Sequence, residues 1–133
     1  MRIGEGIVVF ITGGASGFGE SSTRRLHALG ASVCVADLNA QRMQALHAEL
    51  QERILCVPCN VGKESEVKSA IDKAVETFGT IHVVLTCAGV LFPAPLLTDE
   101  ESLNTKNFEA TIAVNVYGSA YVAKYAAVAM SKN

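Results

Sequence analysis

The sequence predicts an α/β fold, in which a doubly wound parallel β-sheet carries helices on both faces. The first observation is that short β-branched and apolar runs alternate four times with segments whose apolar residues recur at helical spacing. The second is that the short runs lack the polar alternation of strands with one face in water. Such strands, joined by helices, form a parallel sheet that is buried on both sides.

Composition agrees with one globular domain. The chain has 133 residues, of which 50% are hydrophobic and 18% are charged, whereas roughly 25% are charged in an average soluble domain. This excludes a disordered chain. The net charge of −2 shows no basic excess, which argues against a nucleic-acid partner. The apolar run at 7–11 is too short for a secretory signal, so we expect an intracellular, soluble protein.

The first unit of strand and helix surrounds a pair of glycines. A strand is expected over 7–12, where a continuous apolar run ends at Gly13 and Gly14. Its helix is indicated by residues at helical spacing, namely Phe18, Ser22, Leu26 and Leu29. Gly30 ends this helix.

The second and third units follow the same pattern. Strands are expected over 32–36 and 54–58. Asn39 can cap the second helix, whose apolar face consists of Met43, Leu46 and Leu50. The third helix ends at Gly79, and its apolar face consists of Val67, Ala70, Ile71, Ala74, Val75 and Phe78.

The fourth unit contains a long connection. A strand is expected over 82–86 and a loop over 90–104. Thr105 can cap a final helix that runs to about Met130.

This final helix is apolar on all sides. Between residues 110 and 130 its only charge is Lys124. A membrane span is one interpretation, but Asn115, Ser119 and the prevalence of alanine over leucine argue against it. We expect instead a helix that is buried on two sides, by the sheet and by a partner. Three tyrosines share one face of it and are expected to form a packing or interface stripe: Tyr117, Tyr121 and Tyr125.

The segment T-G-G-A-S-G-F-G at 12–19 joins the first strand to the first helix. Glycine there allows a tight turn, close approach of a pyrophosphate to the backbone, and close contact between helix and sheet. The helix N-terminus adds unpaired N–H groups and a partial positive charge. These features predict a dinucleotide-binding turn, and an ordinary glycine-rich turn is the alternative.

Asp37 ends the second strand. A carboxylate at that point accepts hydrogen bonds from the hydroxyls of an adenosine ribose and repels a 2′-phosphate. No Lys or Arg occurs in 13–19, and Leu38 follows Asp37, so no cation is placed to meet such a phosphate. The pattern therefore favours NAD over NADP. The alternative is that Asp37 merely caps the next turn.

The cysteines and histidines are expected to be structural. The cysteines lie inside apolar runs, which is typical of reduced thiols in an intracellular protein. Cys56 and Cys59 form a C-x-x-C pattern. Zinc would need a second close pair of ligands, and a redox pair would open a helix, so both interpretations are disfavoured. The three histidines are not at ligand spacing from acidic residues or cysteines, and no metal site is expected.

Five motifs in order resemble those of the short-chain dehydrogenase/reductase family. They are T-G-x-x-x-G-x-G at 12–19, Asp37, Asn60-Val61, Cys87-Ala88-Gly89 and N-V-Y-G at 115–118. Within the family, the segments ITGGASGFGE and CAGV and the long loop are most similar to the type 2 3-hydroxyacyl-CoA dehydrogenase branch, also called 17β-hydroxysteroid dehydrogenase type 10. The resemblance covers the whole chain, which corresponds to about the N-terminal half of a family member.

The resemblance implies a Rossmann-type NAD-binding domain over residues 1–133, truncated after the fourth βα unit. It implies that the following residues contact the cofactor: Gly13, Ser16, Gly17, Phe18, Gly19, Asp37, Asn60, Val61, Cys87, Ala88 and Gly89. Two positions depart from the family pattern. Asn60 stands where Asp is usual, and its amide oxygen can still accept from the adenine amino group. Thr86 replaces an Asn, which puts a bond that braces the backbone in doubt.

The resemblance also implies catalysis by an Asn–Ser–Tyr–Lys set, in which a lysine-assisted tyrosine moves a proton while nicotinamide carries hydride. Asn115 matches the first member, which helps to hold a relay water, and its position within a helix fits a local kink. No Tyr-x-x-x-Lys occurs, because Tyr121 and Lys124 are one residue too close. The chain alone is therefore expected to be inactive on the acyl-CoA or steroid-like substrate of a complete enzyme. By resemblance that enzyme would be in the mitochondrial matrix, and otherwise in the cytoplasm.

Two functions stay open. The chain is either the NAD-binding half of a hydroxyacyl-CoA or hydroxysteroid dehydrogenase, or a catalytically silent nucleotide-binding or oligomerisation module. Such a module would be a splice product or fragment that associates with itself or with a full-length relative. The implied strand order is 3-2-1-4, which leaves the strand at 82–86 as an exposed apolar edge. This edge and the last helix predict a homo-oligomer.

Overall fold

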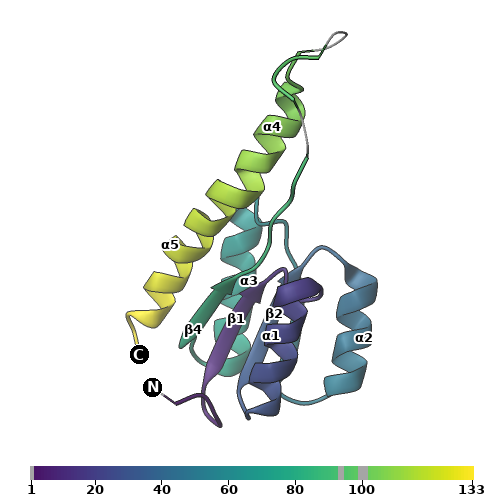
Figure 1. The fold of residues 1–133 in the computed structure, drawn as a ribbon. Helices are drawn as coiled ribbons and strands as arrows, with labels where there is room; N and C mark the ends of the chain where they lie inside the picture. The colour runs from purple at the N-terminus through teal and green to yellow at the C-terminus, as the bar shows by residue number, and fades with distance from the viewer. Residues whose placement is uncertain (1, 93–94, 99–101) are drawn as a thin grey trace.

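A four-stranded parallel sheet forms the centre of the molecule (Figure 1). The computed structural model describes residues 2–92, 95–98 and 102–133. The strands are β1 (Val8–Thr12), β2 (Ser32–Asp37), β3 (Ile54–Pro58) and β4 (Val83–Thr86). Their order across the sheet is β3-β2-β1-β4, and all pairs are parallel. Both the predicted fold class and the implied strand order are confirmed.

Helices cover both faces of the sheet (Figure 1). One face packs against α1 (Gly17–Ala28) and α2 (Ala40–Leu50), and the other against α3 (Glu64–Phe78) and α5 (Gly118–Met130). Side chains alternate between the two faces along each strand. In β1, therefore, Val9 and Ile11 join the core under α1 and α2, whereas Phe10 joins the core under α3 and α5.

The apolar face predicted for α1 is wrong at its first position. Phe18 is 91% exposed, and Leu29 at the other end is also exposed. The residues buried against the sheet are the small ones, Gly19 and Thr23. The Thr23 hydroxyl donates to the Gly14 carbonyl oxygen at 3.1 Å. Small residues bring this helix close to the turn that precedes it, and a larger side chain would hold the two apart.

The caps of the later helices are made by asparagines. The Asn39 side chain accepts from the Arg42 N–H at 2.9 Å, as predicted for α2. The final helix is capped by Asn104, which accepts from the Asn107 N–H, and the predicted cap at Thr105 is one residue too late. Both residue types are good caps, so composition alone did not separate the two positions.

The final helix has three parts. They are α4 (Thr105–Ile112), the π-helical segment η1 (Ala113–Tyr117) and α5. The π-helical turn contains Asn115, where a kink was expected. In Figure 1, α4 extends well beyond the sheet, whereas α5 runs back along it.

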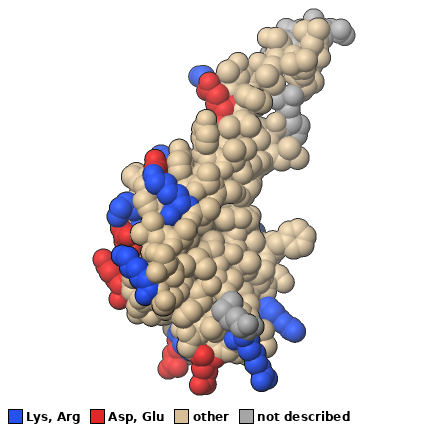
Figure 2. Space-filling model, turned by 90° about the vertical axis from the view of Figure 1, so that its left-hand side faces the viewer, with Lys and Arg blue, Asp and Glu red and all other residues tan. Residues whose placement is uncertain are grey.

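Within this chain α5 is covered on one side only. Val122 and Ala126 are buried in the core with α3, and Tyr121 and Tyr125 pack against that core. Tyr117, the last residue of η1, and Val128 in α5 are exposed, so the predicted tyrosine stripe is packed at Tyr121 and Tyr125 only. Figure 2 faces the α5 and β4 side and shows a broad uncharged area with charged side chains along its margin and base. The second covering surface is thus absent from the described residues, and among them no helix is long and apolar enough to cross a membrane.

Candidate functional site

The glycine-rich turn lies at the carboxyl end of β1. Gly13 has a φ of +64°, and a Cβ there would lie 2.8 Å from the Ala88 backbone. A Cβ on Gly19 would lie 2.0 Å from the Gly13 carbonyl oxygen. Glycine is therefore required at both positions, because the first turn of α1 closes directly onto the end of β1 and beside the segment after β4.

The N-terminus of α1 has backbone N–H groups that make no hydrogen bond within the described residues. Its N-cap, Ser16, makes no side-chain hydrogen bond to the helix. In the described part of the chain, the N–H groups of Gly17, Phe18 and Gly19 donate no hydrogen bond. Unpaired N–H groups at the positive end of a helix form a site for an anionic group such as a pyrophosphate.

Asp37 lies beside this turn. Its Oδ2 accepts from the Ala15 N–H at 3.0 Å, and its Oδ1 accepts from the Asn39 N–H at 2.9 Å. The second bond is the turn cap that sequence offered as the alternative, and the first connects the carboxylate to the glycine-rich turn. Each oxygen of an ionised carboxylate has two acceptor positions, so Asp37 can still accept from ligand hydroxyls.

The loop after β3 is fastened to the start of α3. The Asn60 N–H donates to Glu66 Oε2 at 2.7 Å, and Asn60 Oδ1 accepts from the Gly62 N–H at 3.0 Å. Lys63 forms an ion pair with Glu66 at 3.1 Å. The Asn60 N–H bond, followed by Lys63, lowers the pKa of the Glu66 carboxyl below its ordinary value of 4.5.

This lowered pKa predicts a pH-dependent contribution of Glu66 to stability. A carboxyl whose folded-state pKa lies below its unfolded value stabilises the fold fully above the unfolded pKa, and the effect is lost as pH falls through the folded pKa. Glu66→Gln should therefore be less stable than wild type at neutral pH, and the difference should shrink as pH falls below about 4.3, the unfolded pKa, and be lost below the folded-state pKa. Urea unfolding followed by circular dichroism across this range checks it. A difference that stays constant with pH would contradict it, and exposed Glu76→Gln is the control.

The segment after β4 completes the site. The Ala88 N–H donates to the Thr12 hydroxyl oxygen at 3.3 Å. The Asn115 side chain bonds both backbone groups of Val90, accepting from its N–H and donating to its carbonyl oxygen, each at 2.8 Å. Sequence reasoning gave no role to Thr12. The feature of the sequence that could have indicated this role is a hydroxyl side chain at the last residue of a buried strand, directly before the glycines.

These elements line an open cavity of about 180 Å³ at the carboxyl ends of the strands. Most of the predicted cofactor residues line it: Gly13, Ser16, Asp37, Asn60, Val61, Cys87, Ala88 and Gly89. Gly17, Phe18, Gly19 and Asn115 are not among its lining residues. Gly17 and Gly19 belong to the adjoining helix N-terminus, and Phe18 points into solvent.

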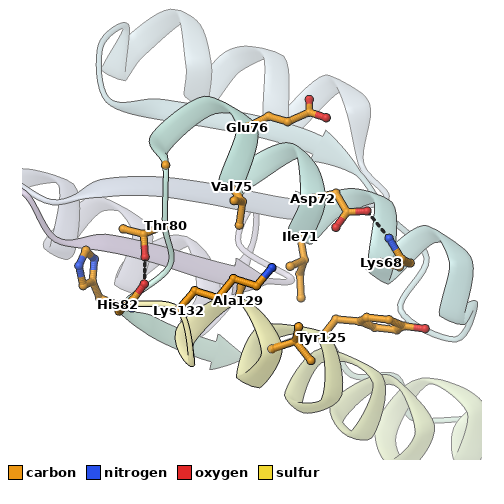
Figure 3. A pocket seen from close by; sticks show the side chains of 13 residues that line it. Lys68, Ile71, Asp72, Val75, Glu76, Thr80, His82, Tyr125, Ala129 and Lys132 are labelled. Carbon is orange, nitrogen blue, oxygen red and sulfur yellow. Dashed lines mark hydrogen bonds and ion pairs between the residues drawn. The ribbon is translucent and has the colours of Figure 1, made fainter.

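A larger hollow of about 850 Å³ lies elsewhere, between α3 and α5 (Figure 3). Ile71 and Val75 face Tyr125 across it, and Lys68 is paired with Asp72 at 2.5 Å. His82 at its margin accepts from the Val8 N–H through Nδ1 at 3.0 Å, so this histidine has a structural role rather than an incidental one. This hollow lies away from the glycine-rich turn, and it gathers no set of groups suited to catalysis.

Cys56 and Cys59, the C-x-x-C pair, are free thiols with raised pKa values. Burial, followed by Asp37, raises the pKa of the Cys56 thiol to about 11, and burial followed by Glu66 does the same for Cys59. Redox-active thiols have lowered pKa values. Over residues 2–92, 95–98 and 102–133, no cluster of His, Cys, Asp or Glu could hold a metal ion.

Together, the strand order and the helices on both faces define an α/β domain of the Rossmann type. Residues 7–133 match the family described as short chain dehydrogenase. The chain belongs to this family.

Its relatives are dehydrogenases about twice as long. The chain is 34% identical to 3-hydroxyacyl-CoA dehydrogenase type-2 of Rattus norvegicus, covering 100% of this chain and 52% of the relative. It is 35% identical to Short-chain dehydrogenase reductase 3b of Arabidopsis thaliana, covering 95% and 48%. A short-chain dehydrogenase/reductase structure from Mycobacterium ulcerans superposes with a TM-score of 0.89 at 28% identity, covering 98% of this chain and 49% of that one. The chain thus spans about half the length of the relatives it matches.

Proposed function

We propose that residues 1–133 form the NAD(H)-binding part of an oxidoreductase that transfers hydride between NAD and a secondary alcohol or ketone. The observation that carries the proposal is the Asp37 carboxylate, which bonds the Ala15 N–H within the glycine-rich turn and lines the cavity. None of the cavity-lining residues is Lys or Arg. An anionic wall without a cation suits the diol of an adenosine ribose and repels a 2′-phosphate, which favours NAD over NADP.

Different residues of this chain would contact different parts of the cofactor. The N–H groups at the start of α1 suit the pyrophosphate and Asp37 suits the adenosine ribose, while Asn60 and Val61 would lie beside the base. Cys87, Ala88 and Gly89 would form the floor of the cavity. When bound, the nicotinamide would supply the hydride chemistry. Of the catalytic set that the resemblance implies, this chain contains only Asn115. Acyl-CoA or steroid-like substrates therefore belong to a complete enzyme.

Calorimetric titration of the 133-residue chain tests this proposal. ADP-ribose and NAD should bind with similar affinity, because the groups that suit the nicotinamide are incomplete here. NADP should bind at least about tenfold more weakly, which corresponds to 1.4 kcal/mol. No turnover of acetoacetyl-CoA with NADH is expected. Absence of ADP-ribose binding, or turnover by this chain alone, would refute it.

We further propose that this chain associates with itself through β4 and α5, which is the oligomerisation alternative. Among the described residues β4 pairs with β1 alone, and Tyr117 of η1 and Val128 of α5 expose apolar surface. An unpaired strand edge is a template for another strand. A twofold axis perpendicular to the sheet would join two β4 strands and set two α5 helices side by side. The uncharged area in Figure 2 would meet its own copy without like charges in opposition.

Sedimentation at micromolar concentration tests this association. The wild-type chain should sediment as a dimer or larger species. Val128→Glu should weaken association by about tenfold or more, since a twofold interface brings two such charges together. Ala48→Glu, on the exposed face of α2, is the matched control and should leave association unchanged. A well-folded wild-type monomer would rule the association out.

A further inference from the structure

The side chain of Asn60 has one fixed orientation. Its Oδ1 accepts from the Gly62 N–H two residues later at 3.0 Å. A rotation that exchanged the amide oxygen and nitrogen would set two donors against each other, so this bond assigns the orientation. A Cβ on Gly62 would lie 3.2 Å from the same oxygen, which shows how closely the loop surrounds it.

The backbone of Asn60 is held as well. Its N–H donates to Glu66, and its carbonyl oxygen accepts from the Lys63 N–H at 3.0 Å. The Nδ2 amino group, in contrast, has no acceptor among the described residues, and neither has the N–H of Val61. Both residues line the cavity. Two free hydrogen-bonding groups of this wall, the Asn60 amino group and the Val61 N–H, are therefore donors.

This arrangement differs from the one that sequence suggested. There, the amide oxygen of Asn60 was expected to accept from the amino group of adenine. In the structure, that oxygen already accepts a hydrogen bond from the Gly62 N–H. The free Nδ2 amino group of Asn60 suits a purine that carries an acceptor at its 6-position better than one that carries an amino group there. Adenine has an amino donor at that position beside one acceptor, N1, whereas a 6-oxopurine such as hypoxanthine or guanine has a carbonyl oxygen with two acceptor positions beside an N1–H donor. The carbonyl oxygen can therefore accept from the Asn60 amino group and also from the Val61 N–H.

We infer that Asn60 makes the base end of this cavity tolerant of 6-oxopurines, so that a nicotinamide dinucleotide with hypoxanthine binds at least as well as NAD. The inference rests on the proposed function, since it concerns the base of the same ligand. Asn60 is a specificity-determining residue in this account. An aspartate there would present only acceptors, favouring the adenine amino group and repelling the oxo group.

The experiment compares the dissociation constants of NAD and nicotinamide hypoxanthine dinucleotide for the full 133-residue chain and its Asn60→Asp variant. Wild type should bind the hypoxanthine dinucleotide at least as tightly as NAD. Asn60→Asp should shift the ratio toward NAD by about tenfold or more, because one donor–acceptor match becomes a charged mismatch. Asn107→Asp, on α4 and away from the cavity, is the control and should keep the wild-type ratio.

The outcomes separate the two proposals. If NAD binds and is strongly preferred by wild type, or if Asn60→Asp leaves the ratio unchanged, the inference about Asn60 is overturned and the proposed function stands. If neither dinucleotide binds to folded wild-type protein, the proposed function is overturned and the inference with it. Because the test is a ratio within each variant, a general loss of stability in Asn60→Asp does not imitate the expected shift.

Discussion

Gly19→Ala is expected to lower the free energy of unfolding by about 3 kcal/mol and to abolish binding at the glycine-rich turn. The added methyl would lie 2.0 Å from the Gly13 carbonyl oxygen, which is a backbone atom at the end of a buried strand. Neither the strand nor the first turn of α1 can move away without breaking sheet contacts. Urea unfolding and ADP-ribose titration measure the two effects.

Gly17→Ala is the matched control for this prediction. Gly17 lies in the same turn, but a Cβ there would meet nothing within 4 Å. Its φ of +52° still makes a side chain unfavourable, at a cost of about 1 kcal/mol. Equal losses of stability in the two variants, measured at one protein concentration, would mean that the close contact between α1 and β1 is not what requires glycine at position 19.

Asp37→Ala is expected to weaken the binding of ADP-ribose by roughly 100-fold. The substitution removes the acceptor for the Ala15 and Asn39 N–H groups and, in the proposed complex, the acceptor for the ribose hydroxyls. Asp37→Asn keeps one acceptor oxygen, so its affinity for ADP-ribose should lie between those of wild type and Asp37→Ala. It should also bind NADP relatively better than wild type, because the charge that repels a 2′-phosphate is gone.

Asp72→Ala is the control for this experiment. Asp72 is an exposed carboxylate on α3 that pairs with Lys68, beside the larger hollow and outside the nucleotide cavity. Its removal should leave ADP-ribose binding unchanged. Unaltered ADP-ribose affinity in folded Asp37→Ala would remove the ribose assignment, and the preference for NAD over NADP would lose its main support.

The sheet could be predicted from sequence because its signal is local. Apolar runs such as that of β1 are buried on both faces, so burial leaves a continuous pattern in the sequence. Gly13 and Asp37 could also be located, because each directly follows a strand. Side-chain direction was harder to predict. Phe18 continues a helical pattern but points into solvent, since the sheet accepts only small residues where α1 approaches it most closely.

The hydrogen-bond partners of residues in loops could not be predicted from the sequence. The Gly62 N–H occupies the side-chain oxygen of Asn60 and leaves the side-chain nitrogen free. The direction of that N–H follows from the conformation of the loop, which the sequence does not reveal. Likewise, Thr12 contacts the Ala88 N–H only because β1 and β4 are neighbours in the sheet, although they are far apart in the chain. Asn115 could be singled out by resemblance, but its two bonds to Val90 could not.

Through those two bonds, Asn115 connects the final helix to the segment that follows β4. A further hydrogen bond lies near the other end of α5, where the side-chain Nδ2 of Asn133 donates to the Ile81 carbonyl oxygen at 2.8 Å. The apolar packing of Val122 lies between them. A protease that cut the exposed chain at Leu96 or Leu97 would therefore yield a nicked protein whose pieces stay together until a denaturant separates them.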